Sequence, residues 1–136
     1  MAEERMWIDG EWCAAENGET SEAMNPATGE VMAAVPKATV GDVDRCVEAS
    51  RRALQGAEWK KMDPAQRGRV LNKMAAVTYE TAQELAVVES SNNGKTFREA
   101  LSEIRYGAWT LEYFAGLTDK IEGTTIPVPG SRLNYT

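Results

Sequence analysis

Three helix-start signals of one kind follow residue 38, and they constrain the fold more than any other feature of the chain. The segments Thr39–Asp42, Asp63–Gln66 and Thr96–Glu99 each carry a capping residue three positions before a side chain that reaches back to it. After each signal, apolar residues recur with the helical period of about 3.6 residues, whereas the residues before Thr39 follow the strand period of two. The sequence therefore predicts strands first and long helices after them.

The segment before Thr39 contains two predicted β-hairpins. Asp9-Gly10 lies between apolar residues in Trp7–Trp12, and this dipeptide favours a type I′ turn, whose two central residues need a positive φ. The second hairpin is predicted from a strand over Thr20–Met24, a turn over Asn25–Gly29 and a return strand over Glu30–Val35. We expect these hairpins to be structural and to carry no site.

The first predicted helix places Val43, Cys46, Val47 and Leu54 on one face. Cys46 is therefore predicted to be a small core residue. The alternative is that Cys46 is a reactive nucleophile, but among its sequence neighbours only Arg45 would stabilise a thiolate.

The later helices are bounded by recognisable stop signals. The helix that begins at Pro64 is long, and a break over Tyr79–Thr81 is expected before a stop at Asn92-Asn93-Gly94. The helix that begins at Phe97 is predicted to run until Gly123. Residues 124–136 contain two prolines and a Pro129-Gly130 turn, which indicate an exposed β-ribbon.

Composition excludes several classes of function. The 136-residue chain has a formal charge of −6, which disfavours nucleic acid and anionic membranes as partners. Its acidic start lacks the features of a secretory signal, so a cytoplasmic location is expected. The chain has no histidine, so it cannot form a Ser-His-Asp triad or a His-ligated zinc site. Cys13 and Cys46 are too few for a metal cage and are expected to remain thiols.

Two local patterns suggest chemistry and are better explained by structure. Asn93–Thr96 resembles the end of a Walker phosphate loop, but it follows a helix and has Glu89 where the first glycine is required. A plain inter-helix turn is the prediction. Glu99 and Glu103 are spaced as a possible acid–base pair, although an exposed helix stripe is the expected explanation.

Six strings, in order, resemble the opening region of the aldehyde dehydrogenase superfamily. They are Trp7–Trp12, Asn25–Val31, Trp59 with Asp63-Pro64 and Arg67, Asn93–Lys95, Tyr113–Gly116 with Asp119-Lys120, and Thr125–Val128 with Tyr135-Thr136. Each string is weak alone, but their shared order covers nearly the whole chain. The chain is therefore identified as resembling the N-terminal portion of an NAD(P)-dependent aldehyde dehydrogenase.

The resemblance implies an α/β fold and a division of the chain. Residues 1–123 are expected to supply the N-terminal hairpins and outer helices of a Rossmann-like coenzyme-binding domain, which is incomplete within this sequence. Residues 124–136 are expected to begin the β-ribbon through which members of the family form homo-oligomers, as dimers or tetramers.

The resemblance also implies a chemistry whose residues lie elsewhere in the family's chain. Members oxidise aldehydes to carboxylic acids with NAD or NADP, using a cysteine thiolate nucleophile and a glutamate base. Neither Cys13 nor Cys46 has the context of that nucleophile, so no catalytic and no cofactor-binding residue is assigned. By resemblance, Glu103 is the candidate ligand for a monovalent cation; the alternative is an exposed helix charge.

Two hypotheses for function remain. In the first, the chain is the N-terminal part of an aldehyde dehydrogenase, is inactive alone and binds no coenzyme alone. In the second, it is a free-standing interaction module that pairs through its C-terminal ribbon, because an unpaired ribbon edge is a template for strand addition.

Overall fold

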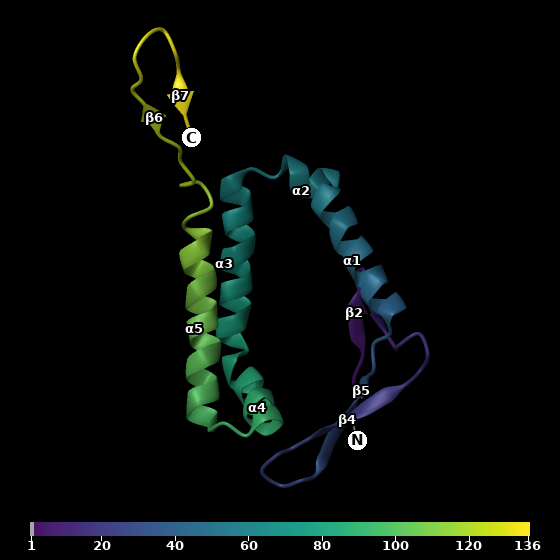
Figure 1. Ribbon diagram of the computed structural model, residues 1–136. Coiled ribbons are helices and arrows are strands. Elements are labelled where there is room, and N and C mark those ends of the chain that lie inside the picture. Colours follow the sequence, from purple (N-terminus) through teal and green to yellow (C-terminus); the bar gives the residue numbers. More distant parts are fainter. Residues whose placement is uncertain (1) are drawn as a thin grey trace.

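The computed structural model describes residues 2–136 as two limbs that form an open frame. Figure 1 shows strands β1 to β5 and α1 (Val40–Gln55) in one limb and α3 (Pro64–Glu80), α4 (Ala82–Asn93) and α5 (Phe97–Ala115) in the other, with α2 (Ala57–Lys61) joining them at one end. At the opposite end, the β4–β5 turn meets the α4–α5 turn, where a Cβ on Gly94 would lie 3.0 Å from Cγ of Pro26. A ribbon of two strands projects beyond α5 (Figure 1).

The strands form three small sheets rather than one large sheet. They are β1 Ala2–Glu3, β2 Met6–Ile8, β3 Glu11–Cys13, β4 Thr20–Met24, β5 Val31–Pro36, β6 Thr125–Ile126 and β7 Asn134–Tyr135. Strand β5 lies between β1, which is parallel to it, and β4, which is antiparallel to it. The other two sheets are the β2–β3 and β6–β7 hairpins. The mixed helix-and-strand class predicted from the sequence is confirmed.

The first predicted hairpin is confirmed in its details. Asp9 and Gly10 have φ values of 55° and 84°, as a type I′ turn requires. Trp7 pairs with Trp12 across the strands, and their ring centroids are 4.9 Å apart. The Asn25–Gly29 turn is also confirmed: Gly29 donates its N–H to the Asn25 carbonyl at 2.8 Å.

All three predicted capping boxes form. The helices are α1 Val40–Gln55, α2 Ala57–Lys61, α3 Pro64–Glu80, α4 Ala82–Asn93 and α5 Phe97–Ala115. The side chains of Thr39, Asp63 and Thr96 accept the backbone N–H three residues later, and their own backbone N–H groups donate to the side chain at that position. The expected break falls at Thr81, and α4 ends at Gly94, which has a φ of 80°. The short α2 was not predicted.

The predicted end of the last helix at Gly123 is wrong, because α5 ends at Ala115. The Thr118 hydroxyl donates to the Ala115 carbonyl at 3.0 Å, and the Leu117 N–H donates to Phe114. These local bonds take carbonyls that a continuing helix would use, so the chain turns early. Residues 125–135 then form the predicted ribbon, in which Thr136 donates to the Thr124 carbonyl at 3.0 Å.

The prediction that Cys46 is a core residue is also wrong, because its side chain is exposed. The apolar residues predicted on the same face of the helix are exposed too: Val43, Val47 and Leu54 have exposed fractions of 53%, 42% and 62%. The helical period correctly placed these residues on one face. Within residues 2–136, however, no element covers that face of α1.

The core between the helices is made of very small residues. Every buried hydrophobic residue within residues 2–136 is an alanine, and the largest fully buried side chain is Asp42. On the helices of the second limb, the buried positions are Gly68, Ala75, Ala82, Ala86, Ala100, Ala108 and Ala115. Small side chains let α3 and α5 approach closely, and Figure 1 shows the two helices side by side and antiparallel.

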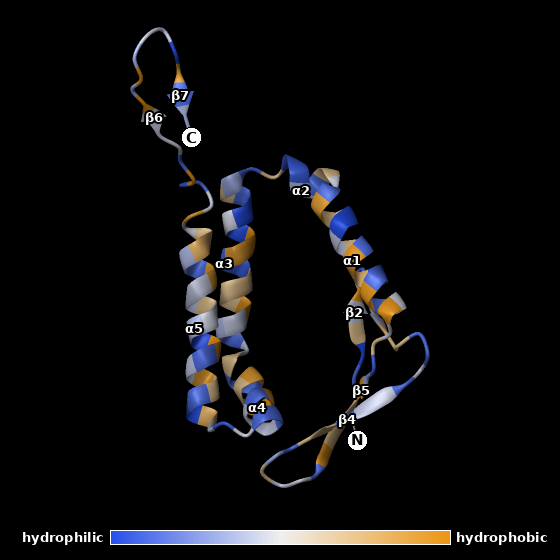
Figure 2. Ribbon diagram, in the orientation of Figure 1, coloured by the Kyte–Doolittle hydropathy of each residue, from blue (hydrophilic) through white to orange (hydrophobic). Residues whose placement is uncertain are grey.

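The large apolar side chains lie outside this core. Figure 2 shows apolar stretches along α1, α3, α4 and α5. The accessible surface is 10537 Å² for a mass of 14.9 kDa. A compact monomer of that mass exposes about 7,000 Å², so this frame exposes about half as much again.

None of the helices within residues 2–136 is both long enough and apolar enough to cross a membrane.

Two helical glycines provide a test of the close packing between α3 and α5. A Cβ on Gly68 would lie 2.8 Å from both the Ala115 carbonyl oxygen and Oγ1 of Thr118, whereas a Cβ on Gly107 meets nothing within 4 Å. We expect Gly68→Ala to lower the free energy of unfolding by about 1–3 kcal/mol through overpacking. The measurement is urea unfolding followed by circular dichroism.

Gly107→Ala is the matched control, because it makes the same change on the neighbouring helix without a clash. It should be neutral or stabilising by about 0.5–1 kcal/mol, since alanine favours helix. Equal effects of the two substitutions would contradict a close seam at Gly68.

Candidate functional site

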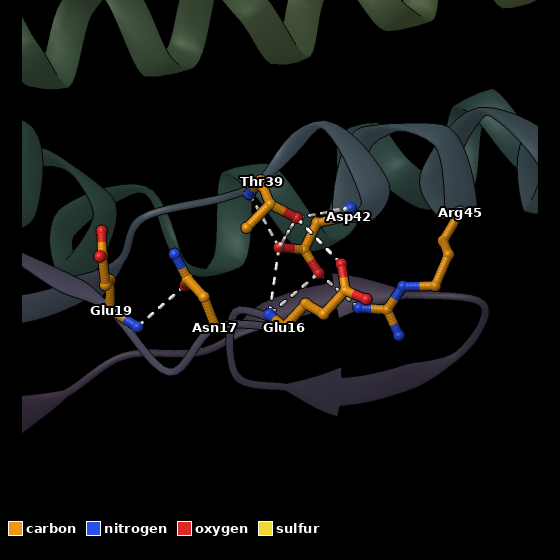
Figure 3. A network of polar contacts seen from close by, with 6 residues as sticks. All are labelled: Glu16, Asn17, Glu19, Thr39, Asp42 and Arg45. Atoms are coloured by element: carbon orange, nitrogen blue, oxygen red, sulfur yellow. Dashed lines mark hydrogen bonds and ion pairs between the residues drawn. The ribbon is translucent and has the colours of Figure 1, made fainter.

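The most developed polar site is centred on Asp42, which is 1% exposed at the start of α1 (Figure 3). Its carboxylate accepts from the Thr39 N–H at 2.8 Å and from the Thr39 hydroxyl at 3.0 Å. It also accepts from the Glu16 N–H at 3.2 Å and from the Arg45 guanidinium. The site therefore ties the loop after β3 to the N-terminus of α1.

These donors control the charge of Asp42. The Thr39 N–H has the largest influence, and together with Arg45 and the Glu16 N–H it holds the pKa of Asp42 well below its usual range. Burial acts in the opposite direction and is outweighed. In return, the bond to Asp42 raises the pKa of Arg45.

Such a carboxylate is unsuited to acid–base catalysis. A general base works best when its pKa lies near the working pH, whereas Asp42 remains ionised far below neutral pH. Its oxygens are already occupied by donors from Thr39, Glu16 and Arg45. The arrangement positions a helix and a loop, and it offers no free group to a substrate.

The two cysteines lie on different elements, Cys13 on β3 and Cys46 on α1. Cys13 is half-buried in β3 and lines a cavity of about 210 Å³ between the first hairpin and α1. The arginines of that cavity are already paired, Arg45 with Asp42 and Arg52 with Asp9 at 2.9 Å. Cys46 is exposed on α1. Glu11 and Glu48 line the same cavity as Cys13, but within the described residues neither thiol donates a hydrogen bond to a base, as an activated nucleophile would.

The Asn93–Thr96 segment is an inter-helix turn, as predicted. Gly94 caps α4, and Thr96 caps α5. Between them, Lys95 forms ion pairs with Glu103 and, at 3.0 Å, with Glu89. The bonds to Glu103 and Glu89 raise the pKa of Lys95. The lysine is thus engaged in joining α4 to α5 rather than aimed at a phosphate.

The same contacts locate the two glutamates considered from the sequence. Glu99 accepts the Thr96 backbone N–H at 3.4 Å in the capping box and also the Thr96 hydroxyl at 2.8 Å, whereas Glu103 accepts the Lys95 ammonium. They are engaged by different groups and are not arranged as a catalytic pair. Residues 4–136, whose side chains the structure describes, contain no group of three or more Cys, Asp or Glu placed to hold a metal. The proposed cation ligand Glu103 has an ammonium as its neighbour.

A match to a protein family covers most of the chain. Residues 12–136 match the aldehyde dehydrogenase family model. The chain belongs to the aldehyde dehydrogenase family.

Individual aldehyde dehydrogenases resemble the chain closely over part of their length. Mouse retinal dehydrogenase 2 is 40% identical over 134 residues, which are 97% of this chain and 26% of that protein. Cytosolic 10-formyltetrahydrofolate dehydrogenase of Xenopus tropicalis is 39% identical over 96% of this chain and 14% of its own length. The chain thus spans about a quarter or less of these relatives.

Solved structures support the same relationship. The NAD⁺ complex of the Bacillus cereus aldehyde dehydrogenase superposes with a TM-score of 0.91 at 40% identity. The superposition covers 98% of this chain and 27% of that enzyme. The resemblance inferred from six short strings is therefore confirmed for the family and for the fold.

Sequence reasoning identified Asp42 only as a capping residue. The Thr39–Asp42 spacing predicted its bonds to Thr39, but its burial and its contact with Glu16 depend on a loop 26 residues away. No local pattern signals that contact.

The depressed pKa of Asp42 predicts an acid-dependent contribution to stability. The folded state prefers the ionised carboxylate more than the unfolded chain does, so the stabilisation is complete above the unfolded pKa of about 3.9. It is lost as the pH falls toward the lower pKa of the folded state. We expect Asp42→Asn to lower the free energy of unfolding at pH 7.

The difference between wild type and Asp42→Asn should shrink as the pH falls from about 4 to about 2, measured by urea unfolding at each pH. Asp44→Asn is the control, because Asp44 is exposed on the same helix. A difference that stays constant over this range would show that the carboxylate charge of Asp42 is not what stabilises the site.

Proposed function

We propose that this chain forms the N-terminal scaffold of an NAD(P)-dependent aldehyde dehydrogenase, an oxidoreductase that converts aldehydes into carboxylic acids. The observation that carries the proposal is its fit to one quarter of an enzyme with bound coenzyme, at a TM-score of 0.91 over 98% of this chain. In this proposal residues 1–123 belong to the coenzyme-binding domain, and residues 124–136 begin the oligomerisation ribbon.

The exposed apolar faces support a scaffold that is covered by further polypeptide. Val70, Met74 and Val77 line an open hollow of about 400 Å³ along α3, and all three are exposed. Large contiguous apolar surface on a soluble protein marks an interface. We infer that the coenzyme-binding sheet packs against this side of the frame.

The chemistry is assigned to residues outside this chain. Within the described residues Cys13 and Cys46 donate no hydrogen bond to a base, and Asp42 is fully engaged, so no catalytic and no coenzyme-binding residue is assigned here. We expect NAD or NADP to bind only when the remainder of the enzyme is present. Alone, the chain should neither oxidise aldehydes nor bind coenzyme.

The ribbon supports a homo-oligomer, as a dimer or a tetramer. Strands β6 and β7 project from the helical limb; Ile126 on β6 and Tyr135 on β7 are 43% and 70% exposed, and Leu133, just before β7, is 76% exposed. Exposed strand edges with apolar side chains are suited to pairing with another sheet. The acidic chain and its cytosolic relative favour a cytoplasmic location, with no nucleic acid or membrane as partner.

A chimeric enzyme tests the proposal with a known polypeptide joined after Thr136. Residues 1–136 would replace the matching quarter of the Bacillus cereus aldehyde dehydrogenase, with which they share 40% identity. We expect the purified chimera to oxidise an aldehyde with reduction of NAD⁺, followed by absorbance of NADH, because the helices of this chain should support the same coenzyme domain.

The 136-residue chain alone is the control and should give no turnover and no heat of coenzyme binding in calorimetry. A well-folded chimera that neither binds NAD⁺ nor turns over would contradict the scaffold proposal. Tight binding of NAD⁺ by the chain alone would contradict the assignment of the coenzyme site to other residues.

The second candidate is a free-standing interaction module that pairs through its ribbon, and the exposed β6–β7 edges are the observation that favours it. Sedimentation of the chain alone separates the two proposals. A folded, monodisperse assembly that dissociates when Ile126 and Leu133 are changed to Asp would favour the module. An aggregated or loosely folded chain would favour the scaffold.

A further inference from the structure

Two asparagines in the chain are followed by glycine: Asn17, in the loop after β3, and Asn93, the last residue of α4. The side-chain amide of such an asparagine can react with its own backbone, because the nitrogen of the next residue is close enough to attack Cγ. Glycine shields that nitrogen least, since it has no side chain. Asn25 has no such route, because Pro26 follows it and proline has no backbone N–H.

Asn17 lies in an exposed turn (Figure 3). Gly18 is exposed as well, and a Cβ on it would meet nothing within 4 Å. The Gly18 N–H donates to the Ala15 carbonyl at 2.9 Å, and this bond has to break before the nitrogen can attack. The Glu19 N–H donates to Oδ1 of Asn17 at 3.0 Å. That second bond polarises the side-chain carbonyl and would stabilise the oxyanion that forms on it during attack.

Asn93 is also exposed, but its reacting groups are held more firmly. The Gly94 N–H donates to the Ser90 carbonyl at 2.9 Å and caps α4, and Gly94 lies against the β4–β5 turn. Nδ2 of Asn93 donates to Glu89 at 2.7 Å, and Oδ1 accepts the Lys95 N–H at 2.9 Å. The carbonyl is thus polarised as at Asn17, so the two sites differ in the freedom of the reacting groups.

We propose that Asn17 is a site of spontaneous deamidation in the folded protein and that the fold protects Asn93. The Gly18 nitrogen bonds to Cγ of Asn17, the C–N bond of the side-chain amide breaks, and ammonia leaves with the proton that the Gly18 nitrogen gives up. Water then opens the cyclic imide at one of its two carbonyls, which produces aspartate or isoaspartate at position 17. Water is the sole co-reactant of the two steps.

The products act on the Asp42 site, because the altered turn presents one of its donors. The Glu16 N–H, one residue before Asn17, donates to the Asp42 carboxylate at 3.2 Å. Isoaspartate adds a methylene to the main chain of this turn, and both products add a negative charge between Glu16 and Glu19. Deamidation therefore weakens the tie between the loop after β3 and the start of α1.

The test is incubation of the purified 136-residue chain at neutral pH, followed by peptide mass spectrometry of both Asn-Gly segments. In the folded chain we expect Asn17 to lose its amide about tenfold faster than Asn93, because more hydrogen bonds have to break at Asn93. In concentrated urea, which removes both folded environments, the two rates should converge.

Asn17→Gln is the matched control, because its longer side chain would have to close a larger and less readily formed ring. It should abolish the reaction at this position and leave the rate at Asn93 unchanged. A folded chain in which Asn93 reacts as fast as Asn17, or in which Asn17 is stable while the urea-unfolded chain reacts, would overturn the proposal. Circular dichroism of the same samples verifies folding; if the chain alone does not fold, the same two peptides of the folded chimera decide the outcome.

The effect on the Asp42 site has a separate readout. In deamidated chain, Asp42→Asn should lower the free energy of unfolding by less than in fresh chain, because part of the contact with the loop is already lost. Asn17→Asp adds the charge without the extra methylene and should show a smaller reduction of this kind. An unchanged effect of Asp42→Asn in deamidated chain would contradict the link to Asp42. None of these measurements depends on dehydrogenase activity, so failure of the proposed function would leave their outcome unaffected.

Discussion

The structure depends on the close approach of α3 and α5, which only very small residues allow. Gly68 and Ala75 on α3 and Ala108 and Ala115 on α5 are buried, so the helices meet almost backbone to backbone. An alanine buries little apolar area, and each square ångström contributes only about 25 cal/mol. The seam therefore fixes the geometry of the limb but leaves the large side chains free to pack against something else.

Small residues form the contact between the helices and large apolar residues lie outside it, and this separation explains the open shape of the frame. The limbs meet through α2 and through the contact of Pro26 with Gly94, and the large apolar side chains remain outside both meeting points. Such faces are available to pack against further polypeptide. The polar sites are structural as well. Asp42 and Lys95 each join two segments of the frame, and neither is free for a substrate.

Capping and turn patterns in the sequence predicted most of the helices and strands, but they did not predict which faces of those elements are buried. The capping boxes at Thr39, Asp63 and Thr96, the Asp9-Gly10 turn and the stop at Gly94 depend on neighbours within a few residues, and all are present. The extension of the last helix to Gly123 was wrong because the Thr118 hydroxyl competes for a helix carbonyl. The core position of Cys46 was wrong because a periodic stripe shows which residues share a face, not whether that face is covered.

By itself, the sequence determined the family, through six ordered strings, and most of the helix starts and turns, through short-range hydrogen bonds. It also showed that the chain has no histidine and only two cysteines, so the chemistry accessible to it is narrow. Only the tertiary structure decided that Asp42 is buried among donors from a distant loop and that Lys95 pairs with glutamates of both α4 and α5. Burial and charge pairing depend on segments that are far apart in the chain, and no local pattern encodes which of those segments meet.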